Sequence, residues 1–430
     1  MNEIIAASED LMKRVERVWK FQSKYGVIPI TGITPMVYEM DNLAKSIPSI
    51  KRPQNIDEVI TSELKRRLEG DSFCLGEWLN PDNSETDAIL AIYGIPKRDV
   101  SNLKKVLEKN KKRTEKAIDR LFKTKNITEY TMGASTDVPD VRDLAESIAK
   151  LKIEKYHIKI GELLQELTPA GDYLREIKAV PTTNPRSYYN VVQKRLAIGI
   201  PSICFSTEDG SIDISEKELI RIYGHEGMGH ALNRVMTMNA KLPYFLSNGS
   251  ALTSSTDESV AQFYQQVIFE DLKNSPKTQK DLGISHIFEE IYQDSKDISL
   301  IGDYQLKLSQ YAISVLADKS LGDPSDTKTI KKKIELISEV SLDPRYARSF
   351  VESHRNSYDS DGNFNPSMVA ELRYCAQPVQ RALAEFKKHG ITYDNNRGLI
   401  DQTFLTGVWT PKGFVDNARI KAQESSNKGK

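Results

Sequence analysis

Residues 215–238 read SEKELIRIYGHEGMGHALNRVMTM. Their first residues form a capping-box pattern, S-x-x-E, which predicts a helix that begins near Glu216. On this helix lie His225, Glu226 and His230, in the pattern H-E-x-x-x-H. Only six histidines occur among the 430 residues, and two of them flank one glutamate, so we expect a site for a single zinc ion.

The spacing of these two histidines requires an unusual backbone. At 3.6 residues per turn, five steps place them about 140° apart, too far for one metal ion. A wider turn with i→i+5 hydrogen bonds holds about 4.4 residues and returns them to about 50°. Gly227 and Gly229 flank Met228, and each glycine costs about 0.5–1 kcal/mol in a helix interior. The sequence therefore predicts a π-type turn here; the alternative is a simple Gly-x-Gly helix break.

A catalytic zinc site needs a third protein ligand and an open position. The segment 252–272, LTSSTDESVAQFYQQVIFEDL, predicts a second helix with its N-cap at residues 255–256. Glu258 falls in its first turn, 28 residues after His230, which lets the second helix return beside the first, and we expect Glu258 to be the third ligand. The alternatives are a capping role for this glutamate and two other acidic ligands, Asp257 and Glu270.

Helical periodicity dominates the rest of the sequence, with short irregular connections. The longest predicted helix covers 141–167 and ends before a proline. One clear β segment is expected at 195–214, where β-branched and aromatic residues flank Asp209 and Gly210 as in a hairpin. The sequence therefore predicts a mainly α fold with a small β element (α+β).

Three regions are expected along the chain. An N-terminal helical region covers 1–130, a catalytic domain covers 140–420, and a polar, disordered tail covers 421–430. The first region begins with an amphipathic helix over 1–20, and turn residues dominate its segment 70–96. The boundary before the catalytic domain falls in the loop-like sequence NITEYTMGASTDVPD.

Composition limits the classes of function. The chain has 60 Lys+Arg against 60 Asp+Glu, so it lacks the cationic surplus of a protein built to coat nucleic acid. Three scattered cysteines favour a reducing compartment over a disulfide framework. The first 21 residues lack a signal-peptide pattern, and no apolar window is long enough for a membrane span. We expect a cytoplasmic protein that binds neither nucleic acid nor membrane.

The neutral total conceals one strongly basic segment. Residues 97–125 contain twelve basic and four acidic residues, a local charge of +8. Leu103, Leu107 and Ala117 fall on one helical face, so basic residues cover the opposite face. Such a face is either a solvated surface or a docking surface for an acidic protein partner.

The motif HEGMGH, followed about 28 residues later by TDESVAQFYQQ, resembles the gluzincin metallopeptidases, whose third ligand is a Glu on a following helix. The expanded motif is similar to the H-E-x-x-G-H of dipeptidyl peptidase III. The spacing to the second helix is similar to that of the microtubule-associated tyrosine carboxypeptidases. This resemblance covers about residues 200–270, and neither the first 130 residues nor the C-terminal third shares it.

The resemblance implies a zincin-like catalytic domain and hydrolysis of peptide bonds in a peptide or protein substrate. His225, His230 and Glu258 would hold the zinc, and Glu226 would activate water, with a carboxypeptidase favoured over an aminopeptidase or an oligopeptidase. It also implies that the strand segment 195–214 offers an edge to an extended peptide; the alternative is a hairpin that only packs against the helix. The alternative from a different class is a non-catalytic scaffold that docks an acidic partner through 97–125.

Gluzincins also use a Tyr, His or Arg from a later helix to stabilise the oxyanion. His354 and Tyr358, at i and i+4, are the candidates for this substrate or oxyanion role. Competitors for the oxyanion role or for clamping a substrate carboxylate are Arg186, Tyr188, Tyr189, Arg355, Arg373 and Tyr374.

Overall fold

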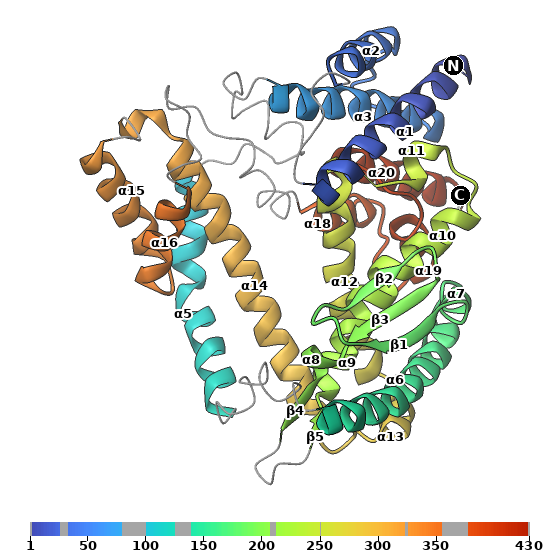
Figure 1. Ribbon diagram of the computed structural model, residues 1–430, viewed down its shortest axis with the longest axis vertical. Coiled ribbons are helices and arrows are strands. Elements are labelled where there is room, and N and C mark those ends of the chain that lie inside the picture. The colour runs from blue at the N-terminus through green and yellow to red at the C-terminus, as the bar shows by residue number, and fades with distance from the viewer. Residues whose placement is uncertain are drawn as a thin grey trace.

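The protein is mainly helical with a small β component, as the sequence predicts (Figure 1). The computed structural model describes residues 2–25, 33–79, 100–124, 139–206, 212–249, 251–322, 326–354 and 377–428. The first helices in chain order are α1 (Asn2–Tyr25), α2 (Ile33–Ser46), α3 (Ile56–Leu79), α5 (Val100–Thr124), α6 (Pro139–Leu167), α7 (Gly171–Leu174), α8 (Ile200–Ile203), α9 (Glu216–Ile222), the π-helix η5 (Tyr223–Leu232) and α10 (Asn233–Asn239). They are followed by α11 (Tyr244–Ser247), the 3-10 turn η6 (Ala251–Thr253), α12 (Ser254–Lys273), α13 (Pro276–Leu282), α14 (Phe288–Ala317), the 3-10 turn η7 (Lys319–Leu321), α15 (Thr327–Val340), α16 (Pro344–His354), α18 (Pro378–Lys387), α19 (Arg397–Phe404) and α20 (Pro411–Lys428).

The β component consists of two small sheets. The first has the order β1-β3-β2, with β1 (Lys178–Thr182) parallel to β3 (Arg195–Gly199) and β2 (Tyr188–Asn190) antiparallel to it. The second pairs β4 (Cys204–Ser206) with β5 (Ile212–Ile214).

The expectation of one hairpin over 195–214 is therefore only partly right. The β4–β5 pair is antiparallel, but β3 belongs to the other sheet. The chain leaves β3 at Gly199 and enters α8, whose first turn contains Pro201. Because proline cannot donate to a strand ladder, it favours this break between the two sheets. Asp209 and Gly210 lie outside the described residues.

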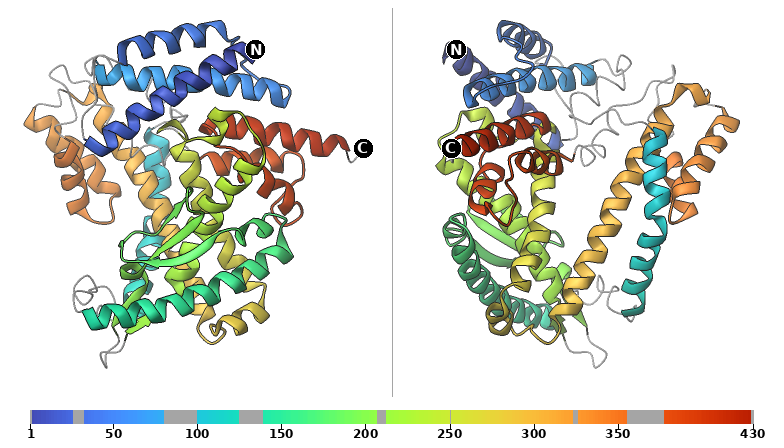
Figure 2. Two further views of the ribbon diagram at one scale, coloured as in Figure 1. Left: turned by 45° about the vertical axis from the view of Figure 1, so that its right-hand side comes forward. Right: turned by 180° about the vertical axis from the view of Figure 1, so that it is seen from behind.

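Two separate clusters of buried apolar side chains hold the helices. The larger cluster draws on α1–α3, α6, both sheets, α9 to α12 with η5, and α18–α20. The smaller one joins α5, α15 and α16 to the later turns of α14, and these segments form the lobe to one side in Figures 1 and 2. The first turns of α14 belong to the larger cluster. Residues 1–130 contribute to both clusters, and the expected division into regions at 130 and 140 stays a prediction.

Several expected elements are confirmed and two are corrected. The amphipathic N-terminal helix and the helix ending at residue 167 are present as α1 and α6. Residues 70–79 are helical rather than turn-rich, because Leu75 is fully buried and packing outweighs local propensity. Residues 421–428 continue α20 rather than forming a disordered tail, with Ala422 buried. Most of the expected boundary loop over 126–140, namely 126–138, lies outside the described residues.

Within the described parts of the chain, no helix combines the length and apolar character that a membrane span requires.

Candidate metal centre

Three consecutive helical segments, α9, η5 and α10, run without interruption from residue 216 to residue 239. The first begins where the sequence predicts, because the Ser215 hydroxyl accepts a hydrogen bond from the Glu218 N–H at 3.3 Å. The second half of the expected capping box is not formed. The Glu218 carboxylate pairs with Arg221 at 2.6 Å, and the Ser215 N–H donates to the Ile203 carbonyl at 2.7 Å.

The predicted wide turn is confirmed as η5, a π-helix of 10 residues that contains both motif histidines. Two of its glycines allow close contact with α12. A Cβ atom at Gly224 would lie 2.7 Å from the Gln265 Cα, and one at Gly229 would lie 2.3 Å from the Ala261 Cα. At Gly227 the nearest atoms would be 3.5 Å away, which is ordinary contact. The close approach of η5 to α12 therefore explains why glycine is needed at positions 224 and 229, but it does not explain Gly227.

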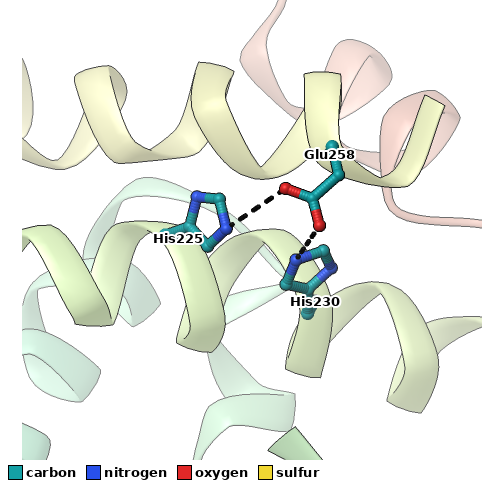
Figure 3. Close-up of side chains that lie close together, drawn as sticks. All are labelled: His225, His230 and Glu258. Carbon is teal, nitrogen blue, oxygen red and sulfur yellow. Dashed lines mark ion pairs between the residues drawn. The ribbon is translucent and has the colours of Figure 1, made fainter. Parts of the chain in front are cut away.

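His225, His230 and Glu258 converge between η5 and α12 (Figure 3). One Glu258 oxygen lies 3.6 Å from the His225 Nε2 atom, and the other lies 3.6 Å from the His230 Nε2 atom. These separations exceed a hydrogen bond. They approach the distance of about 3.3 Å between neighbouring ligands of a tetrahedral zinc ion. The spacing therefore suits a metal ion held among the three groups.

The electrostatics of the histidines also suit a metal. Burial, and then the neighbouring His230, lowers the pKa of His225 to about 3. Burial, and then Arg234, lowers the pKa of His230 to about 4. Both imidazoles are therefore neutral at pH 7 and keep the lone pair that a metal needs.

Glu226 lies next to the first histidine and is half-buried. Burial, and then the charge of Glu258, raises the pKa of its carboxyl group to about 7, while Arg221 acts in the opposite direction. A carboxyl group with a pKa near 7 can both accept and release a proton at neutral pH. This group is the candidate general base that the sequence predicts.

The alternative third ligands are engaged elsewhere. Asp257 accepts a hydrogen bond from Arg234 at 2.7 Å, and Glu270 accepts from the Tyr292 hydroxyl at 2.7 Å. Within the described residues, the metal-compatible cluster contains neither of them.

The start of α12 differs slightly from the expectation. The helix begins at Ser254 with Thr253 as N-cap, rather than with an N-cap at residues 255–256. The Ser255 hydroxyl is buried and makes no hydrogen bond with the residues that the structure describes, so it does not form a capping box with Glu258.

The candidates for oxyanion stabilisation remain predictions. His354 is the last residue of α16, a helix that Figures 1 and 2 show apart from α12. Tyr358, Arg355, Arg373 and Tyr374 lie outside the described residues. Of the upstream competitors, Tyr189 lies on β2, which packs beside η5. Its buried hydroxyl has no hydrogen-bond partner among the described residues.

Sequence reasoning missed Gly224 and Arg234. Neither belongs to the H-E-x-x-x-H pattern, and their importance depends on which residues of α12 lie opposite them. The spacing of Gly224 and Gly229 repeats the five-residue interval of the histidines and is the one signal that was present.

Comparisons with protein-family models, curated proteins and solved structures found no match to this chain.

Proposed function

We propose that this protein is a zinc-dependent peptidase of the gluzincin type with a zincin-like catalytic domain. The observation that carries the proposal is the convergence of His225, His230 and Glu258 across a π-helix, with Glu226 beside them. A regular α-helix would not bring histidines five residues apart to one point. The costly backbone is therefore best explained by the site that it builds.

The residues divide into two roles. His225, His230 and Glu258 would hold one zinc ion, which supplies a Lewis acid that polarises a carbonyl group and makes water more nucleophilic. Glu226 accepts the proton of the attacking water at its carboxylate. It then releases that proton to the nitrogen of the leaving amine.

The substrate would be an extended peptide or protein segment. β2 is an edge strand of its sheet and packs beside η5, which supports addition of a peptide strand there. The expected edge at 195–199 is not available, because β3 lies between β1 and β2 and pairs with both. The favoured reaction is removal of a C-terminal residue in the cytoplasm. This preference rests on the motif resemblance.

The proposal is tested by digesting a peptide library and identifying the products by mass spectrometry. The wild-type protein is expected to cleave, and the products distinguish terminal from internal cleavage. Glu226→Gln should keep zinc but lose about 100- to 10,000-fold in kcat/KM, because it lacks the general base. If Glu226→Gln retains wild-type activity, the assigned mechanism is wrong.

A second candidate function uses the basic face of α5. Leu103 and Leu107 are buried in the smaller cluster, and α5 is fixed to its neighbours by ion pairs of Arg120 with Asp297 and of Lys104 with Glu339. Its exposed face carries four lysines at i, i+4, i+7 and i+11: Lys105, Lys109, Lys112 and Lys116. This row favours docking of an acidic protein segment, with or without catalysis.

Docking is tested by titrating the protein with a polyglutamate peptide at low and moderate salt. Changing all four lysines to glutamine should abolish the salt-dependent binding. The control changes three exposed lysines of α15, Lys328, Lys331 and Lys332, to glutamine and should bind normally. Equal binding by both variants would remove this function from consideration.

A further inference from the structure

An ion pair joins α12, which carries Glu258, to α10, which continues directly from the π-helix η5 with its two histidines. Arg234 lies on α10, four residues after His230, and Asp257 directly precedes Glu258 on α12. The Arg234 Nη2 atom donates to the Asp257 Oδ2 atom at 2.7 Å. The two side chains are only 22% and 17% exposed, so water screens the pair less than it would a surface pair.

The segment that leads into α12 is packed closely on both sides. A Cβ atom at Gly249 would lie 3.3 Å from the Arg234 Nη2 atom, so the arginine passes close over this backbone. From the other side, Arg67 of α3 donates to the Asn248 carbonyl at 3.4 Å. Leu252 packs so closely on α3 that a Cβ atom at Gly70 would lie 2.5 Å from it.

Glu258 needs such support because it directly follows Asp257, the acidic residue in the first turn of its helix. First turns lack the full set of internal hydrogen bonds and are less firmly held than a helix interior. Yet each of its two oxygens must remain near a different histidine, at the 3.6 Å seen here. A functional site tolerates displacements of only about 0.5 Å.

We infer that Arg234 is a positioning residue of the metal centre, acting through Asp257. The ion pair fixes the first turn of α12 against α10, and thereby holds Glu258 at ligand distance from His225 and His230. The inference deepens the proposed function and rests on the zinc site proposed there.

The charge of Arg234 and its positioning role predict opposite changes in zinc affinity when the residue is removed, so the inference can be tested. Removing a cation beside a zinc site should by itself strengthen zinc binding. Loss of positioning should weaken it, by about 10- to 100-fold for a residue that supports a ligand. We therefore expect Arg234→Met and Asp257→Asn each to bind zinc about 10- to 100-fold more weakly than the wild-type full-length chain.

The measurement is competition for zinc against a chelating dye, together with the visible spectrum after cobalt substitution. The matched control is Asp271→Asn, which breaks another ion pair of α12, with Arg397 at 2.8 Å, far along the same helix. This control should lower thermal stability but leave zinc affinity and the cobalt spectrum unchanged. The double variant Asp257→Glu with Arg234→Lys restores the pair with one longer and one shorter side chain, and should recover zinc affinity.

The outcomes separate the two claims. If wild type binds zinc and Arg234→Met binds it as tightly or more tightly, the positioning role is wrong and the zinc site stands. An equal loss in Asp271→Asn would also overturn the positioning role, since any weakening of α12 would then suffice. If wild type binds no zinc, the proposed function fails as well. Should Asp257→Asn not fold, Arg234→Lys still decides, because it keeps the charge and shortens the reach.

Discussion

Neighbouring groups and burial act in opposite directions on the pKa of the Glu226 carboxyl group. Burial and the charge of Glu258 raise its pKa to about 7, while the Arg221 guanidinium lowers it. Arg221 is itself paired with Glu218 and is partly exposed, so its effect on the carboxyl group is moderate. The balance leaves the proposed base in the range where proton transfer is most effective.

Removing Arg221 should shift the pH dependence of activity. A nearby cation stabilises the carboxylate, so Arg221→Met raises the pKa of Glu226. Because the base must be ionised to act, the rising limb of kcat/KM against pH should move to higher pH. Arg221→Lys keeps the charge and should stay near the wild-type limb. A shift to lower pH in Arg221→Met would show that Glu226 is not the group that titrates.

For individual residues, the sequence predicted those site members whose positions follow from their spacing along the chain. The intervals from His225 to His230 and on to Glu258 placed three residues that the structure brings together. Arg234 and Asp257 could not be paired in the same way. They are 23 residues apart, and the packing of α12 on η5, which continues into α10, brings them together.

The π-helix η5 is the element on which the site depends. Its backbone lets both histidines face α12, and Gly224 and Gly229 allow the two helices to approach closely. The sequence predicted this element from an interval that a regular helix cannot use. It did not predict β1 and β2, because short strands of three to five residues give too little periodicity.

Alanine at two neighbouring glycines should have opposite effects on stability. Gly229→Ala would place a methyl group 2.3 Å from the Ala261 Cα, so overpacking should cost about 1–3 kcal/mol. Gly227→Ala finds its nearest atoms at 3.5 Å and should be neutral or stabilising by up to about 1 kcal/mol, since alanine favours helix. Chemical denaturation of both apoproteins measures the difference. Equal destabilisation would contradict the close packing of η5 on α12.

At the scale of the whole molecule, the N-terminal helices belong to the same packed body as the site. α3 buries Glu63, Arg67 and Asp71 on one face, and Arg67 reaches the carbonyls of Asn248 and Val408. Through these hydrogen bonds, Arg67 joins α3 to the segment before α12 and to the C-terminal part of the chain. Such contacts join residues more than 180 positions apart, so the sequence alone could not predict them.

Asp71 should make stability depend on pH. Burial raises its pKa to about 6, although Arg67 acts in the opposite direction. The folded chain therefore binds this proton more strongly than the unfolded chain does. The resulting stabilisation is full below about pH 4 and is lost as the pH rises through 6.

Asp71→Asn carries no such charge. It should raise the free energy of unfolding at pH 7.5 by up to about 3 kcal/mol, with a smaller gain at pH 4.5. Urea denaturation at both pH values measures this effect, with Asp57→Asn as an exposed control on the same helix. A loss of stability at pH 7.5 would show that the ionised group is favoured by its partners.

The central claim is that His225, His230 and Glu258 hold a zinc ion. The most direct test is the metal content of the purified full-length protein after equilibration with zinc, measured by mass spectrometry of the metal. We expect about one zinc per chain in the wild type. His230→Ala and Glu258→Ala should each lose it while remaining folded. A wild-type protein that takes up no zinc, or variants that retain it fully, would contradict the account.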